Sequence, residues 1–392
     1  MAVQASRYRT ALAAPGHGRT RPFWNDEEPR PLTTAADRRV LVTGGAGFVG
    51  ANLSIALAER HPDWEVVALD NLKRRGAELN LPRLRAAGVR FVHGDVRERS
   101  DLEAVERCDA LVECSAEPSA LAGRDGATDY AMQSNLIGAW NCLELARRDD
   151  AQVVFLSTSR VYPVAALNEL VLEETETRFE IAAGQSLTGA SPAGIAESFP
   201  LDGARTLYGT TKLSAELLIA EYRDAFGLRA VVDRCGVIAG PWQMGKVDQG
   251  VFTHWMLAHL LGGRLAYIGF GGSGKQVRDL IHVADLIDLV ELQLLEPERW
   301  DGVVANVGGG RDCSLSLAET TALCREISGN ELPVGAAGED RPGDVPVYLS
   351  DCARLFELTD WRPRRNARTV LEDVANWIRE HEHAVRSALQ LG

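Results

Sequence analysis

The chain of 392 residues carries a formal net charge of -13, and 45% of its residues are hydrophobic. This composition is typical of a soluble globular protein with one large domain or two modest ones. The acidic balance argues against binding to nucleic acid or anionic membranes, and no apolar run reaches the ~18 residues that a membrane span requires. We therefore expect neither nucleic acid nor a membrane as a partner.

Cysteine and histidine are scattered along the chain. The seven cysteines show no CxxC spacing, and the eight histidines do not cluster with them. An odd number of cysteines with mostly apolar neighbours predicts buried free thiols rather than a zinc site. The basic N-terminus is not followed by the apolar segment of a secretory signal. We expect a cytoplasmic protein without a metal.

Residues 1–38 are rich in Arg, Pro, Ala and Thr, and we expect a mobile extension there. From residue 39 onward, short apolar and β-branched runs alternate with helical patterns; the runs lie at residues 39–43, 64–70, 89–95, 110–114 and 152–157. Such alternation is typical of parallel βαβ units. It predicts an α/β fold with a doubly wound parallel sheet of the Rossmann type, mainly within residues 39–235.

The second half of the chain has a different character. Residues 163–207 are rich in Glu, Thr, Gly, Ser and Pro and predict an irregular insert, functional or flexible. Residues 236–392 mix helices, strands and loops. We expect them to form mainly a smaller α/β lobe that binds substrate over the carboxyl ends of the parallel strands, with some segments returning to the Rossmann domain.

A glycine-rich turn follows the first predicted strand. Gly44, Gly47 and Gly50 form a GxxGxxG pattern between that strand and a predicted helix. Glycine permits a tight turn and lets backbone N–H groups approach a pyrophosphate, and the helix dipole favours the anion. Taken alone, the pattern is equally consistent with a turn that merely needs positive φ. Its position predicts a dinucleotide site.

Acidic residues end the second and third strands. Asp70 is placed to accept hydrogen bonds from the adenosine ribose and to repel a 2′-phosphate, which favours NAD over NADP. Asp95 is placed to accept from the adenine amino group. Lys73, Arg74 and Arg75 could receive a 2′-phosphate or be solvated loop charges, and the sequence leaves both interpretations open.

A YxxxK motif, Tyr208 to Lys212, begins an amphipathic helical pattern. A spacing of four places phenol and ammonium on one helix face. The ammonium is predicted to stabilise tyrosinate and to lower the pKa of Tyr208 from about 10 toward neutrality, so that it can accept a proton from a substrate hydroxyl. Thr158 lies at a strand end fifty residues earlier, and its hydroxyl is placed to bridge the tyrosinate and the substrate hydroxyl. Alone, YxxxK also fits a half-buried tyrosine above a solvated lysine.

Together these motifs resemble the extended short-chain dehydrogenases/reductases of the nucleotide-sugar epimerase/dehydratase type, from about residue 39 to residue 377. The resemblance implies NAD as cofactor, a nucleotide-diphosphate sugar as substrate and a homodimer. It implies Thr158, Tyr208 and Lys212 as catalytic residues. The implied cofactor contacts are Gly44, Gly47, Phe48, Val49, Asp70, Asn71, Asp95, Val96, Ser115, Asn135, Tyr208 and Lys212. The implied substrate contacts are Glu117, Ser159, Arg160, Gln249, Gln276, Arg278 and Arg341.

Within that family the long insert and the Asp248-Gln249-Gly250 segment are similar to the CDP-tyvelose (CDP-paratose) 2-epimerases. That similarity implies oxidation at carbon 2 and hydride return to the opposite face. Sugar 4,6-dehydratases carry Asp-Glu where this chain has Ser159-Arg160, and decarboxylases carry Glu at the second position, so neither chemistry is expected. A 4-epimerase of a UDP- or dTDP-sugar and a non-catalytic dinucleotide sensor remain alternatives.

Several positions depart from the family pattern. Glu113 stands where relatives usually have His, and Glu117 replaces a small or amide residue. Val237 stands where many relatives have Asn near the diphosphate. These departures leave the catalytic set in place and bear on the identity of the substrate.

Overall fold

The computed structural model describes residues 38–119, 121–124, 126–245 and 249–390. The extension predicted for residues 1–38 therefore lies, except for Arg38, outside the described residues, as does Asp248. The description below concerns the described residues of the compact unit that begins at Thr34.

A seven-stranded parallel sheet in the order β14-β10-β5-β4-β1-β2-β3 forms the centre of the fold. The strands are β1 (Arg39–Thr43), β2 (Glu65–Asp70), β3 (Arg90–His93), β4 (Ala110–Glu113), β5 (Gln152–Thr158), β10 (Ala230–Cys235) and β14 (Val304–Val307). Chain order reverses between β1 and β4, where doubly wound sheets bind ligands beyond the carboxyl ends of their strands. The predicted Rossmann sheet is confirmed.

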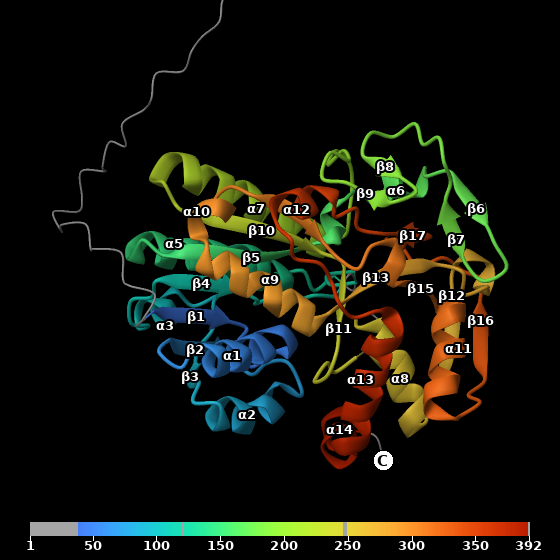
Figure 1. The fold of residues 1–392 in the computed structure, drawn as a ribbon, viewed down its shortest axis with the longest axis horizontal. Coiled ribbons are helices and arrows are strands. Elements are labelled where there is room, and N and C mark those ends of the chain that lie inside the picture. The colour runs from blue at the N-terminus through green and yellow to red at the C-terminus, as the bar shows by residue number, and fades with distance from the viewer. Residues whose placement is uncertain (1–37, 120, 125, 246–248, 391–392) are drawn as a thin grey trace, which may run out of the picture. The chain divides into compact units, whose positions relative to one another are not determined.

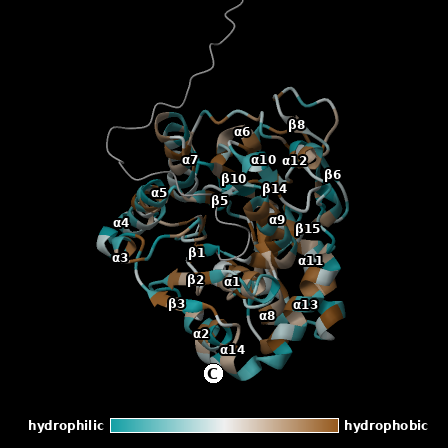
Figure 2. Cartoon of the chain, turned by 60° about the vertical axis from the view of Figure 1, so that its left-hand side comes forward, coloured by the Kyte–Doolittle hydropathy of each residue, from teal (hydrophilic) through white to brown (hydrophobic). Residues whose placement is uncertain are grey.

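Helices cover both faces of this sheet (Figure 1). Side chains along β1 alternate, so that Val40 and Val42 join one buried cluster and Leu41 the other. The first face is covered mainly by α1 (Phe48–Arg60) and α9 (Val283–Leu295), and the hydrophobic residues of α9 are evident in Figure 2. The second is covered by α3 (Arg99–Glu103), α5 (Gly138–Asp149) and α7 (Leu207–Phe226). The smaller helices are α2 (Leu81–Ala86), α4 (Asp129–Met132) and α10 (Pro297–Trp300).

A second, smaller sheet is built around β13 (Val277–His282). β13 pairs in parallel with β11 (Val237–Ala239) and β17 (Val347–Tyr348), and antiparallel with β15 (Ser314–Ser316). A separate parallel pair joins β12 (Leu265–Ile268) to β16 (Val334–Ala337). Three helices bury one apolar cluster beside it, namely α8 (Val251–Leu261), α11 (Leu317–Ser328) and α13 (Ala367–Glu380). Two shorter helices, α12 (Ala353–Leu358) and α14 (Glu382–Leu389), complete this part.

The insert at residues 163–207 is more regular than the sequence predicted. It contains α6 (Val164–Asn168) and two antiparallel hairpins, β6 (Leu172–Glu174) with β7 (Phe179–Ile181) and β8 (Ala190–Ser191) with β9 (Gly194–Ile195). Its few apolar side chains supply the reason, because Leu167, Ile181 and Phe199 pack with Val277 and Tyr348 in a small buried core. The irregular segment expected from composition is thus an ordered layer.

Three expected absences concern the described residues alone. No described helix has the length and apolarity that a bilayer span demands. The described residues contain no group of three or more potential metal ligands. All seven cysteines fall within the described ranges and are free thiols.

Candidate active site

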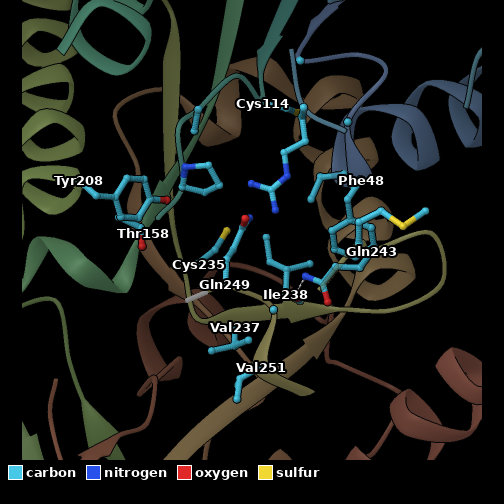
Figure 3. A pocket seen from close by; sticks show the side chains of 18 of the residues that line it. Phe48, Cys114, Thr158, Tyr208, Cys235, Val237, Ile238, Gln243, Gln249 and Val251 are labelled. Atoms are coloured by element: carbon cyan, nitrogen blue, oxygen red, sulfur yellow. Dashed lines mark hydrogen bonds between the residues drawn. The ribbon is translucent and has the colours of Figure 1, made fainter. Parts of the chain in front are cut away.

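A cavity of about 700 Å³ opens between the carboxyl ends of the parallel strands and the smaller sheet. It runs from the glycine-rich turn past the ends of β4 and β5 to β11, α8 and β13. In Figure 3, Thr158 and Tyr208 lie on one side of the cavity and Phe48 and Gln243 on the other. Sixteen of the predicted site residues line this cavity together with Tyr208 and Lys212; they are Gly44, Gly47, Phe48, Val49, Asp70, Asn71, Asp95, Val96, Ser115, Thr158, Ser159, Arg160, Gln249, Gln276, Arg278 and Arg341.

The glycine-rich turn has the geometry of a phosphate cradle. Gly47 is the N-cap of α1, and neither a side-chain cap nor an acidic residue occupies the first turn. A Cβ at Gly50 would lie 2.2 Å from the Gly44 oxygen, and one at Gly47 would lie 3.0 Å from the same atom. The uncapped helix N-terminus and the bare glycine backbone line the cavity and therefore fit a pyrophosphate. This fit is the structural observation that supports a bound dinucleotide.

Asp70 joins the turn to the second strand. Its carboxylate accepts hydrogen bonds from the backbone N–H of Ala46 (3.1 Å) and of Leu72 (2.7 Å). Burial raises the pKa of Asp70, although these backbone donors oppose the rise. A buried carboxylate at the end of β2 both fixes the glycine-rich turn and faces the cavity, as NAD recognition requires.

Asp95 lies at the adjacent strand end. The side chain of Asn71 donates to it at 2.8 Å, and Arg97 forms an ion pair with it at 2.6 Å. Burial alone would raise its pKa, but the bonds from Arg97 and Asn71 lower the pKa of Asp95 to about 2. The carboxylate is therefore ionised and anchored at the mouth of the cavity.

Thr158, Tyr208 and Lys212 meet at the inner end of the cavity. Thr158 ends β5, and a hydrogen bond links its hydroxyl to the Tyr208 phenol. Tyr208 and Lys212 lie in the first turns of α7, whose N-terminus is capped by Thr206 accepting from the Gly209 N–H at 3.1 Å. The Thr206 cap holds the start of α7, and Thr158 holds the phenol from the end of β5, so the position of the Tyr208 side chain in the cavity is fixed from both elements.

Lys212 has a partner that sequence reasoning did not assign. Its ammonium lies 3.1 Å from the Glu113 carboxylate at the end of β4, and each side chain is only 2% exposed. The ammonium also lies 4.3 Å from the centroid of the Phe155 ring. Burial alone would lower the pKa of Lys212, but the carboxylate raises it. The lysine is held as a buried ion pair, because an unpaired buried charge is costly.

This pairing changes the expectation for Tyr208. Burial raises the pKa of the phenol, and the lowering by Lys212 and Thr158 does not reverse the rise. The negative charge of Glu113 also acts to raise it. The predicted fall toward neutrality is thus wrong for the protein alone: Lys212 is present as expected, but a carboxylate offsets its charge.

A cationic region adjoins the phenol. Arg160 follows Thr158 by two residues and donates to the Gly343 carbonyl at 3.0 Å. Arg278 on β13 pairs with Asp344 at 2.5 Å and lines the same cavity. Arg341 lines it as well. The predicted substrate contacts on β13 and after β5 are therefore brought to one end of the cavity.

Two predicted site residues lie elsewhere. Asn135 is 1% exposed, and its amide exchanges hydrogen bonds with the backbone of Glu117 at 2.7 and 3.1 Å. Its Nδ2 also donates to Thr211 at 3.2 Å, so it fastens the loop after β4 to α7. The Glu117 carboxylate accepts from the Ser119 N–H. Neither residue is among those lining the cavity, and these hydrogen bonds account for both side chains.

A second buried ion pair lies beside the catalytic residues on α7. Glu216 binds Arg234 of β10 at 2.7 Å, and the two side chains are 6% and 7% exposed. Glu216 also accepts from the hydroxyl of Ser157, next to Thr158, at 2.5 Å. This network ties α7 to β5 and β10 without contacting Lys212.

Several lining residues escaped sequence reasoning because they belong to segments without a motif. They come from the loop before α8, from α8, from the loop after it and from β12, and comprise Trp242, Gln243, Met244, His254, Trp255, Arg264, Leu265, Ala266 and Ile268. Trp242 has an unusual positive φ of 72° and packs against Arg83 at 4.0 Å. Only its place just after the Gly240-Pro241 pair could have indicated a turn at this point.

Comparison with known proteins agrees with this geometry. The family model described as "NAD dependent epimerase/dehydratase family" matches residues 40–308. The CDP-paratose 2-epimerase of Salmonella typhi is 30% identical over 353 residues, which is 86% of this chain and 98% of the relative. The UDP-glucose 4-epimerase of Azospirillum brasilense is 30% identical over 380 residues, covering 91% and 96%.

A solved structure shows the same arrangement. The UDP-glucose 4-epimerase of Thermus thermophilus in complex with NAD is 25% identical, with a TM-score of 0.69 and coverage of 87% of this chain and 99% of that chain. The resemblance drawn from the motifs and the expectation of NAD as cofactor are confirmed. The chain belongs to the NAD-dependent epimerase/dehydratase family of nucleotide-sugar enzymes.

Proposed function

We propose that this protein epimerises a nucleotide-diphosphate sugar by transient oxidation and re-reduction, acting at carbon 2 of a CDP-sugar of the paratose/tyvelose type. The observation that carries the proposal is the meeting of Thr158, Tyr208 and Lys212 in one cavity. Ser159 and Arg160 follow Thr158, where a dehydratase would need carboxyl groups. Epimerisation requires no further acid or base beyond the phenol.

Each catalytic residue has a separate role in the proposed reaction. NAD, held by the glycine-rich turn and Asp70, would supply the redox chemistry, namely reversible hydride transfer with the sugar carbon. The phenolic oxygen of Tyr208 accepts the hydroxyl proton during oxidation and returns it during reduction. Thr158 orients that oxygen through its hydrogen bond. Lys212, held by Glu113, stabilises the phenolate once it forms.

The carbon and the nucleotide are proposed from similarity. The Salmonella typhi relative is named a CDP-paratose 2-epimerase and is covered over 98% of its length. A UDP-glucose 4-epimerase is equally 30% identical, so 4-epimerisation of a UDP-sugar is the second candidate. The two reactions use the same catalytic residues and differ in which sugar hydroxyl faces Tyr208.

Product analysis by NMR tests the proposal. NAD-loaded protein incubated with CDP-paratose deuterated at carbon 2 should invert that carbon and keep the label, because hydride returns to the carbon that lost it. UDP-glucose in a parallel incubation should remain unchanged. Inversion at carbon 4 of UDP-glucose without any conversion of the CDP-sugar would establish the second candidate and reject the first.

We further propose a cytoplasmic homodimer that associates through the outer surfaces of α5 and α7. Leu217 and Phe226 on α7 are 65% and 48% exposed, and Trp140 on α5 is 37% exposed. Large apolar side chains gathered on neighbouring helices are typical of a subunit interface. Light scattering should give twice the chain mass for the wild type, and Leu217→Glu should shift the species to a monomer.

A further inference from the structure

Arg160 occupies an unusual electrostatic position. It belongs to the short turn directly after Thr158, and its backbone N–H donates to the Thr158 hydroxyl at 3.2 Å. Its guanidinium lines the cavity and donates to the Gly343 carbonyl. Among the residues that the structure describes, no carboxylate lies within ion-pair distance of it.

The charges around Arg160 do not compensate it. Its electrostatic neighbours are Arg278, Asp344 and Tyr208. Asp344 is already engaged by Arg278 at 2.5 Å, so Arg160 and Arg278 share one carboxylate between them. A partly buried cation beside another cation favours the binding of an anion, and five N–H donors in a planar fork suit a phosphate.

We propose that Arg160 binds the sugar-linked phosphate of the nucleotide diphosphate at the catalytic end of the cavity. The resemblance already implies Arg278 as a phosphate contact; Arg160 extends the cationic site from β13 to the edge of the catalytic phenol. The negative phosphate then lies between the two guanidinium groups and neutralises the positive charge for which the protein provides no second carboxylate.

This placement selects the reacting carbon, and to that extent it rests on the proposed function. In a nucleotide sugar the diphosphate is attached to carbon 1. A phosphate held by a residue two positions from Thr158 brings the vicinal hydroxyl, on carbon 2, toward Tyr208. Carbon 4 lies across the ring from the phosphate, and its hydroxyl would require the anion to bind farther from the phenol. Arg160 thus adds a specificity-determining residue to the proposed 2-epimerase.

Binding measurements test the role of Arg160 without requiring turnover. NAD-loaded wild type, Arg160→Met and Arg160→Lys would be titrated calorimetrically with CDP, UDP and the corresponding monophosphates. Arg99→Met is a control for the loss of one positive charge, because Arg99 is 56% exposed, pairs with Glu103 and is not among the residues lining the cavity. Retained NAD, measured by absorbance after denaturation, verifies that each variant is folded and loaded.

We expect Arg160→Met to weaken binding of the nucleoside diphosphate about ten- to a hundredfold, the range for a charge-assisted hydrogen bond. Binding of the monophosphate should change less than twofold, since it lacks the sugar-linked phosphate. Arg160→Lys should recover part of the loss, and Arg99→Met should leave diphosphate binding unchanged.

Three results would overturn the inference. Arg160→Met could bind the diphosphate as tightly as the wild type, or lose the monophosphate equally. It could also lose affinity only for a UDP-linked uronic acid and not for UDP, which would assign Arg160 to a sugar carboxylate. These outcomes are separable from the proposed function: a selective loss of diphosphate binding supports the inference even if no CDP-sugar is epimerised.

Discussion

The ion pair beneath the catalytic phenol offers a direct test of how this site works. Glu113→Gln keeps the shape of the side chain and removes its charge, leaving Lys212 as a buried cation. Breaking such a pair costs about 3–5 kcal/mol, and the new amide can still accept a hydrogen bond, so we expect about 3 kcal/mol. With roughly 350 described residues and about 2.1 cal/mol/K of unfolding entropy per residue, Tm should fall by about 4 °C.

The same substitution should change the pH dependence of catalysis. Without the carboxylate, the ammonium of Lys212 is no longer offset, and the pKa of Tyr208 should fall. The gain or loss of one nearby charge shifts a pKa by roughly one unit or more. Because the base acts when deprotonated, the rising limb of kcat/KM against pH should move about one unit toward acid.

Glu216→Gln is the matched control. It breaks a buried ion pair of similar exposure on the same helix, with Arg234 as the partner. We expect a comparable fall in Tm and an unchanged pH profile. The thiols of Cys114, Cys142 and Cys235 also lie near Lys212; burial raises the pKa of each, so they stay neutral in the assay. If both variants lose stability and neither profile moves, the electrostatic reasoning is refuted.

Tyr208→Phe should lower kcat by about 10²–10⁴ while NAD stays bound, which pre-steady-state assays and cofactor absorbance would check. Gly50→Ala should abolish NAD binding in calorimetry because its Cβ would lie 2.2 Å from a backbone oxygen, whereas Gly338→Ala, with open space around its Cβ, should bind normally. Burial raises the pKa of Asp233 to about 7, so its stabilising contribution is complete below about pH 4 and is lost as pH rises through 7. Relative to the wild type, Asp233→Asn should therefore gain about 3 kcal/mol of unfolding free energy between pH 5 and pH 8 in denaturant unfolding, and a difference that stays constant with pH would count against this.

Local patterns determined the parts of the fold that sequence reasoning recovered. The run before Gly44 is β-branched and the glycines follow at fixed spacing, so both strand and cradle could be located from neighbouring residues alone. Tyr208 and Lys212 share a helix turn, and their proximity follows from helical geometry. The position of Thr158 could be predicted because it ends a parallel strand beside that helix.

Features that depend on distant contacts could not be predicted in this way. Glu113 stands out in the sequence as a departure from relatives, yet nothing local indicates that it meets a lysine 99 positions later. Asn135 was expected at the cofactor because its position matches the family pattern, whereas its amide satisfies the backbone of a neighbouring loop. The insert at 163–207 has a polar composition, and only the tertiary packing of a few apolar residues such as Phe199 gives it order.

Strand β14 joins the central sheet although it is synthesised long after its neighbour β10, and this order matters during translation. β10 pairs with β5 on one side, and its other side pairs with β14, which is not made until residue 307. A nascent chain that has completed the glycine-rich turn and the catalytic helix therefore still presents an unpaired strand edge, which invites association with other chains. The long sequence separation slows closure of that edge. During translation, β10 therefore stays at the edge of the sheet from its own emergence until that of β14.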